Sequence, residues 1–172
     1  MKKCSEFNLL KLIECLLIPS VIGFLSYLFT KNNINIYDII KKPFLSPPPI
    51  VFIIIWSILY LLMGISYYLI LSCKRACTEN IDYNLRRKKN GTVIFYIQLL
   101  FNFLWSLIFF NLRLYFISFI DLIVLLSLVI IMIFKFYKIN KAAAFLQIPY
   151  VLWITFAGYL NLSIYLLNEA FS

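Results

Sequence analysis

Apolar residues occur along this chain in long runs that are separated by short polar and charged segments. A helix needs about 20 apolar residues to cross the hydrocarbon core of a bilayer. Five segments meet this length, so the pattern predicts an all-α integral membrane protein, a single five-helix domain over residues 1–172. The predicted transmembrane spans cover approximately residues 9–29, 50–72, 92–112, 114–134 and 142–167.

The ends of these segments refine the prediction. Only Arg113 separates the third span from the fourth, which predicts a tight antiparallel hairpin. The N-terminus has the charge and apolar run of a signal peptide, but it has no small-residue cleavage site and the run continues to Phe29. We therefore expect a retained first span. No internal repeat is visible, which argues against the duplicated architectures that are common among transporters.

Composition agrees with a membrane location. Hydrophobic residues make up 63% of the chain, against roughly 45–50% in soluble domains. The net charge of +9 comes from basic clusters between the apolar runs, which indicates charge beside the membrane rather than nucleic-acid binding. The chain has no histidine, and its four cysteines form no CxxC pair, so we expect ordinary thiols, no metal and no cofactor.

Basic residues are divided unequally between the two sides of the predicted bundle. Twelve would share the side of the N-terminus and four would lie on the other side. The positive-inside rule then places the N-terminus and the "RRKKN" loop in the cytoplasm and the C-terminus outside, in what we expect to be a bacterial cell membrane. The twelve are Lys2, Lys3, Lys11, Lys74, Arg75, Arg86, Arg87, Lys88, Lys89, Lys135, Lys138 and Lys141, and the four are Lys31, Lys41, Lys42 and Arg113.

The segment "KKPFLSPPPIVFIIIW" leads into the second span on the outer side. Proline suits the first turn of a helix because the N–H groups there have no intrahelical partner, so Ser46 is expected to cap a helix that begins at Pro47. Proline also forces the preceding residue to be extended, which makes the loop stiff. Two interpretations stay open: a simple helix start, or a rigid cover over a cavity on this side.

Polar and aromatic residues recur on one face of three predicted helices. Each stripe alone is consistent with packing, but three in one small bundle favour a pocket lined by aromatic rings and a few polar groups. The tryptophans of the three stripes are expected to converge on this pocket. The stripes are Phe52, Trp56, Tyr60 and Met63; Gln98, Asn102, Trp105 and Phe109; and Tyr150, Trp153, Ala157 and Asn161.

Asp121 is the one carboxylate well inside a predicted span. A charge at the bilayer centre costs about 2.5–3.5 kcal/mol on insertion scales, so an acid at this depth is a functional candidate. A structural hydrogen bond inside the bundle and a role in ligand or proton binding are equally open.

Three blocks of sequence resemble the TspO/MBR family, which includes the bacterial tryptophan-rich sensory proteins and the mitochondrial translocator protein, or peripheral-type benzodiazepine receptor. They are "KKPFLSPP" with the following "W..LY.LMG", "QLLFNFLWSLIFF", and "AAAFLQIPYVLWITFAGYLN". The resemblance implies a five-helix bundle, a homodimer, and binding of tetrapyrroles such as protoporphyrin IX under the first loop. In animal members it also implies binding of cholesterol and synthetic drugs.

Carried over position by position, the resemblance assigns ligand contacts to nine residues: Tyr37, Pro47, Phe52, Trp56, Tyr60, Asn102, Trp105, Trp153 and Ala157. At two places this sequence departs from the family pattern, and each departure limits the ligands that are expected. Loop positions where members often have tryptophan hold Ile36 and Leu45, which argues against stacking of a porphyrin on the loop. Tyr165 is followed by "LLNEAFS", without the basic residue of the steroid-recognition segment, so cholesterol binding is not predicted.

Three classes of function therefore stand. The first is a membrane receptor or carrier for tetrapyrroles and similar flat apolar molecules, with membrane lipid and a second copy of the chain as partners. The second is tryptophan-assisted degradation of porphyrin, and the third is a stress-regulatory scaffold. The chain has no nucleophile paired with a base and no phosphate-binding loop, which argues against conventional hydrolysis and ATP-driven transport.

Overall fold

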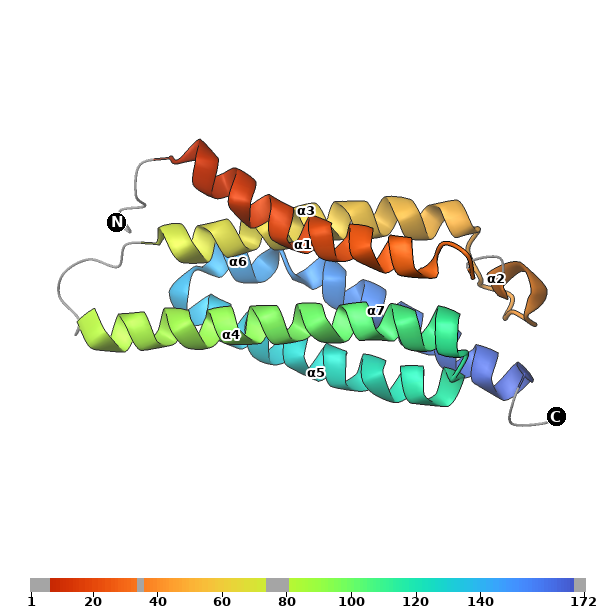
Figure 1. Cartoon of the computed structure of the whole chain (residues 1–172). Helices are drawn as coiled ribbons and strands as arrows, with labels where there is room; N and C mark the ends of the chain where they lie inside the picture. Colours follow the sequence, from red (N-terminus) through yellow and green to blue (C-terminus); the bar gives the residue numbers. More distant parts are fainter. Residues whose placement is uncertain (1–6, 34–35, 74–80, 169–172) are drawn as a thin grey trace.

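The computed structural model describes residues 7–33, 36–73 and 81–168. The secondary-structure elements of these residues are all helices (Figure 1). Five stretches are long and apolar enough to cross a membrane, which confirms the predicted five-helix membrane bundle. The elements are α1 (Leu9–Thr30), α2 (Ile36–Ile39), α3 (Pro49–Ser72), α4 (Ile81–Ser106), the π-helix η1 (Leu107–Leu112), α5 (Tyr115–Ile139), α6 (Lys141–Phe145) and α7 (Ile148–Asn168).

The third and fourth spans are longer than predicted. Helix α4 begins at Ile81 rather than near residue 92, so the "RRKKN" segment is helical and its prediction as a loop is wrong. Lysine and arginine are good helix formers, and charged side chains at a helix end reach water without ending the helix. For the same reason α5 continues to Ile139, through Lys135 and Lys138, five residues past the predicted end.

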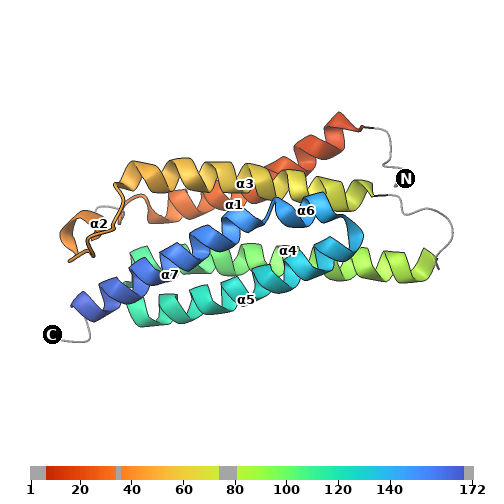
Figure 2. The same ribbon diagram turned by 180° about the vertical axis from the view of Figure 1, so that it is seen from behind.

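The fifth span is interrupted by a short turn at Leu146 and Gln147, which separates α6 from α7 (Figure 2). The Gln147 N–H donates to the Ala144 carbonyl, so the Ala143 carbonyl has no i+4 partner in the helix. The Ser66 hydroxyl of α3 donates to that carbonyl at 2.7 Å. An exposed carbonyl would be costly in lipid, and this bond stabilises the break.

Helices α1 and α3 cross closely at two glycines. A Cβ atom at Gly64 would lie 2.7 Å from the Leu16 Cα atom, and one at Gly23 would overlap the ring of Tyr60. Only hydrogen at these positions permits the approach of the two helices. Pro19 lies inside α1, and because proline has no N–H the helix lacks one internal bond there.

The hairpin between the third and fourth spans has the predicted turn at Arg113. This residue is in the left-handed region, with φ 58°, and its N–H donates to the Ile108 carbonyl. The Asn111 side chain joins the hairpin to α1, because its amide donates to the Phe29 carbonyl at 2.9 Å and its oxygen accepts from Asn33 at 3.0 Å.

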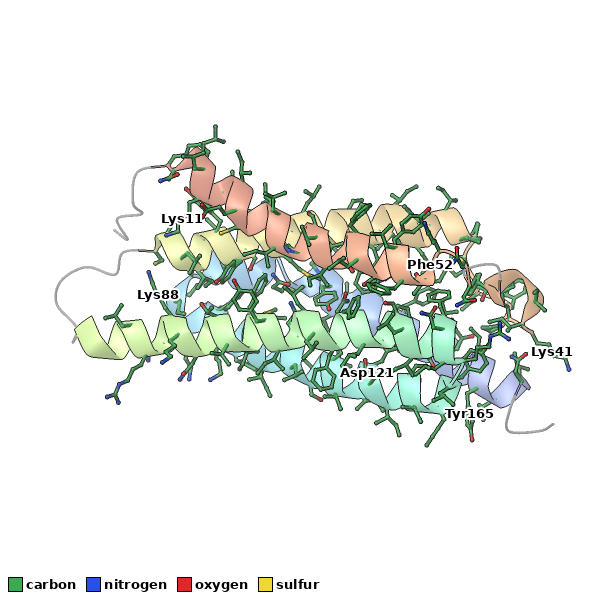
Figure 3. All side chains as sticks on the ribbon, in the orientation of Figure 1. Lys11, Lys41, Phe52, Lys88, Asp121 and Tyr165 are labelled. Atoms are coloured by element: carbon green, nitrogen blue, oxygen red, sulfur yellow. The ribbon has the colours of Figure 1, made fainter. Side chains whose placement is uncertain are left out.

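The ends of the helices are gathered at two opposite ends of the bundle. The start of α1 and the start of α4 lie at one end, whereas α2 and the end of α7 lie at the other (Figure 1). Lys11 and Lys88 are at the first end and Lys41 is at the second (Figure 3). Lys2, Lys3, Lys74 and Arg75 fall outside the described residues. The direction of the bundle across the membrane stays a prediction.

Candidate ligand cavity

A cavity of about 740 Å³ lies between α1, α3, α4, η1 and α7, in the half of the bundle that carries α2. Its wall combines aromatic rings with a few hydroxyl and amide groups. Seven of the nine residues predicted for the site line it: Tyr37, Phe52, Trp56, Tyr60, Asn102, Trp105 and Ala157.

Trp56 lies at the centre of the aromatic wall of the cavity. Its ring stacks on Tyr60, with ring centroids 5.5 Å apart, and lies 6.2 Å from Trp105 on the neighbouring helix. It also meets the edge of Tyr150 at 6.0 Å. Phe109 of η1 continues the wall, 5.7 Å from Trp105. The rings therefore form a continuous apolar surface from α3 to η1.

A chain of hydrogen bonds leads from the cavity wall into the bundle. The Tyr60 hydroxyl donates to Asn102 Oδ1 at 2.8 Å, Asn102 Nδ2 donates to the Tyr150 hydroxyl at 3.1 Å, and that hydroxyl donates to Gln98 Oε1 at 3.0 Å. These bonds pair the Tyr60 and Tyr150 hydroxyls and the Asn102 amide in a region that would exclude water, whereas Gln98 Nε2 has no hydrogen-bond partner among the described residues. The chain fixes the Tyr60 ring, and through its stacking the Trp56 ring, in one orientation.

A second polar group orients Trp105. With the Asn161 amide turned so that its nitrogen faces the Tyr115 carbonyl at 2.7 Å, its oxygen accepts from Trp105 Nε1 at 3.2 Å. Ser118 of α5 bonds to the same amide in either orientation. The indole N–H of Trp105 thus has a partner in the bundle, and its ring is free to present an apolar surface to the cavity.

The loop before α3 closes one end of the cavity. Tyr37 of α2 is only 5% exposed and meets the edge of Phe52, with centroids 5.3 Å apart. Its hydroxyl lies within hydrogen-bond distance of two acceptors, Ser46 Oγ at 3.2 Å and the Pro47 carbonyl oxygen at 3.3 Å. The prediction that Ser46 caps the helix is wrong, because α3 begins at Pro49 and its N-terminal cap is Pro48.

The loop is also tied to the end of α7. The Lys41 N–H donates to Asn168 Oδ1 at 3.0 Å, and Asn168 Nδ2 donates to the Lys41 carbonyl at the same distance. Lys42 places its ammonium 4.7 Å from the centroid of the Tyr37 ring, so a positive charge lies at this end of the cavity. These contacts favour the cover over the simple helix start.

Two predicted residues do not line the cavity. Pro47 is absent from the cavity lining, and its carbonyl lies within hydrogen-bond distance of the Tyr37 hydroxyl in the loop. Trp153 lies behind Phe52, with centroids 5.5 Å apart, and beside Phe156 at 5.6 Å. The three tryptophans therefore do not converge: Trp56 and Trp105 reach the cavity, and Trp153 supports its wall. A stripe of side chains covers about 100° of the helix surface. Sequence spacing therefore does not determine which ring of the stripe lines the cavity and which lies behind another ring.

Sequence analysis missed the contribution of the first span. Ser20, Gly23, Ser26 and Thr30 of α1 line the cavity, together with larger side chains of the same helix. These small residues recur at intervals of three or four, which places them on one face of the helix. This spacing is the sequence feature that could have identified the cavity-lining face of α1. Exposed residues of α1 and α3, such as Tyr27 and Ile53, also line the cavity, so it reaches the lipid-facing surface of these helices.

Asp121 is separate from the cavity. It is 8% exposed in α5, and its Oδ2 atom has no hydrogen-bond partner among the described residues. Figure 3 shows the residue within the bundle rather than at an end of it. Asp121 is not among the residues that line the cavity, and both interpretations of its role stand.

The described residues contain no group of three or more histidine, cysteine, aspartate or glutamate side chains that would hold a metal ion. Cys15 and Cys73 are buried thiols, whereas Cys4 and Cys77 fall outside the described residues. The fold and the cavity thus define a helical membrane protein with an aromatic cavity beneath the loop that precedes α3.

Comparison with known sequences places the chain more narrowly. The sequence profile of the TspO/MBR family matches residues 15–167, so the chain belongs to the TspO/MBR family. It is 39% identical over 162 residues to a tryptophan-rich protein TspO of Archaeoglobus fulgidus, covering 94% of this chain and 99% of that one. It is 28% identical over 146 residues to a translocator protein of Bos taurus, covering 84% and 82%.

Proposed function

We propose that this protein is a membrane receptor or carrier that binds protoporphyrin IX, or a similar flat tetrapyrrole, in the aromatic cavity. The observation that carries the proposal is the continuous wall of Trp56, Tyr60, Trp105 and Phe109 around a volume of about 740 Å³. Ligand pockets typically enclose about 300–1,000 Å³ and combine apolar walls with a few polar groups. A planar macrocycle suits such a wall because aromatic rings stack on its face.

The charges of protoporphyrin IX agree with the same site. Its two propionate groups need water or a cation, whereas its ring needs an apolar environment. Lys42 supplies a positive charge beside Tyr37 at the loop end of the cavity. The ligand would then lie with its ring among the aromatic residues and its propionates toward the loop.

The test is a titration of the purified protein with protoporphyrin IX, followed by quenching of tryptophan fluorescence. Saturable quenching with a single site per chain supports the proposal, since two of the three tryptophans line the cavity. Absence of binding would favour the scaffold. Loss of bound porphyrin under light but not in the dark would favour degradation over carriage.

A further inference from the structure

The ligand cavity is open on one side of the bundle. Among the residues that the structure describes, all exposed residues of its lining belong to α1 or α3, whereas the lining residues of α4, η1 and α7 are buried or half-buried. Phe24 of α1 is 59% exposed and Ile53 of α3 is 56% exposed, and Tyr27 and Ser57 of the same two helices are also exposed. A residue that lines a cavity and is also exposed lies at the edge of an opening. These four residues therefore mark a side opening of the cavity, here called the α1–α3 opening.

The α1–α3 opening lies between two transmembrane helices that cross each other (Figure 1). The ring of Tyr60 packs directly on Gly23, which is a close contact of the two helices beside the opening. Ile53 follows the first residue of α3 by four positions, which is about 6 Å along the helix. The opening would therefore face the hydrocarbon of the bilayer, just below the lipid headgroups on the side of the loop.

The loop end of the cavity is closed more firmly than this side. The Lys41 backbone and the Asn168 side chain exchange two hydrogen bonds, each at 3.0 Å. No hydrogen bond between described residues crosses the α1–α3 opening, and the Ser57 hydroxyl donates to the Ile53 carbonyl of its own helix at 2.8 Å. A ligand that came through the loop would have to break the bonds to α7, whereas a ligand that came from the side would have no such bond to break.

A flat macrocycle with acid groups on one edge takes a defined orientation in a bilayer. Its ring lies in the hydrocarbon and its propionates stay at the headgroups, because burial of a charge without a partner is costly. Inside the cavity the proposed orientation is the same, with the propionates toward Lys42 at the loop end. Such a ligand would pass from the bilayer into the cavity by sideways movement, without turning over.

We propose that ligands enter and leave the cavity through the α1–α3 opening, directly from the hydrocarbon of the bilayer, while the loop stays closed. The ligand class is then amphiphiles that dissolve in lipid, and acyl chains of the surrounding lipid enter the cavity when it holds no ligand. The inference rests on the proposed function for the choice of protoporphyrin IX as the ligand, but not for the existence of the route.

The first test measures binding rates of the full chain in nanodiscs, from the time course of tryptophan quenching by protoporphyrin IX. Ser57→Phe narrows the opening and is expected to lower the association and dissociation rates each by about tenfold, because it raises the barrier between the free and bound states. The affinity, which is the ratio of the two rates, is expected to change much less than either rate.

The matched control for this test is Ser127→Phe. Ser127 is also an exposed helical serine whose hydroxyl donates to the carbonyl four residues earlier, but it lies on α5, outside the cavity lining. Ser127→Phe is expected to show wild-type rates. Asn168→Ala removes both bonds between α7 and the loop and is expected to leave the association rate unchanged. Faster association in Asn168→Ala, together with wild-type rates in Ser57→Phe, would show entry through the loop and overturns the proposal.

The second test needs no porphyrin. It uses a Trp153→Phe protein, whose two remaining tryptophans, Trp56 and Trp105, both line the cavity. The protein is placed in vesicles of phosphatidylcholine with brominated acyl chains, which quench tryptophan fluorescence on contact. Quenching is expected, and it is expected to fall when Ser57→Phe is added but not when Ser127→Phe is added. Absence of quenching, or equal quenching with and without Ser57→Phe, overturns the proposal, whereas the expected quenching without any porphyrin binding contradicts the proposed function alone.

Discussion

Replacement of Trp56 by leucine is expected to weaken both ligand binding and the fold, because the Trp56 ring lines the cavity and also packs against other aromatic rings. The Trp56 ring touches three aromatic partners, Tyr60, Trp105 and Tyr150, at 5.5–6.2 Å. Aromatic pairs contribute about 0.5–1.5 kcal/mol each beyond their buried area, so Trp56→Leu is expected to lower the free energy of unfolding by about 1.5–4.5 kcal/mol. The loss of one ring that faces the ligand is expected to weaken protoporphyrin IX binding about tenfold, which is about 1.4 kcal/mol.

Trp153→Leu is the matched control, because Trp153 also has aromatic partners, Phe52 and Phe156, but lies outside the cavity lining. Trp153→Leu is expected to destabilise the fold through the loss of its aromatic contacts. Its affinity for protoporphyrin IX is expected to change by less than that of Trp56→Leu. Affinity is read from porphyrin absorbance, since both variants lose a tryptophan, and stability is read from thermal unfolding in detergent. If Trp153→Leu weakens binding as much as Trp56→Leu, the ligand does not occupy the cavity as described.

Three further predictions concern the loop, the topology and the helix crossing. Replacing Pro47 and Pro48 together by alanine should weaken protoporphyrin IX binding more than it lowers the melting temperature, because a stiff loop loses less conformational entropy when the ligand binds. Unchanged affinity would show that these prolines only start a helix. In a cysteine-free protein in intact cells, Lys89→Cys should be protected from an impermeant thiol reagent and Phe44→Cys should react. Equal labelling would rule out the orientation. Gly64→Ala should destabilise by about 1–3 kcal/mol through overpacking, whereas Gly158→Ala, with nothing within 4 Å of its new Cβ atom, should not; equal melting temperatures would contradict the close crossing of α1 and α3.

The spans were predictable because membrane crossing requires long apolar runs, and a run leaves a direct trace in the sequence. The turn at Arg113 was predictable for the same reason, since one polar residue between two runs permits only a tight connection. The start of α4 was not, because Arg86 and its neighbours suit an exposed helix as well as a loop. The break at Gln147 lies within an apolar run, and only the bond from Ser66 to Ala143 shows how it is stabilised.

The cavity was partly predictable. Six of the seven predicted residues that line the cavity lie on the aromatic and polar stripes, because spacing determines which residues share a helix face, whereas Tyr37 was assigned from the family resemblance alone. Rotation of each helix about its axis is decided by packing, and this moved Trp153 behind Phe52. The part of the wall that α1 supplies was missed because Gly23 and the neighbouring small residues contribute space rather than a conspicuous side chain.

The most direct test of the central claim is a comparison of protoporphyrin IX affinity between Ala157→Phe and Leu152→Phe. Both changes introduce the same ring into α7, but Ala157 lines the cavity and is 3% exposed, whereas Leu152 is 66% exposed on the lipid-facing surface. We expect Ala157→Phe to abolish saturable binding, because the new ring occupies the space of the ligand, and Leu152→Phe to bind as wild type. Wild-type affinity in Ala157→Phe, or equal loss in both variants, would contradict a tetrapyrrole site in this cavity.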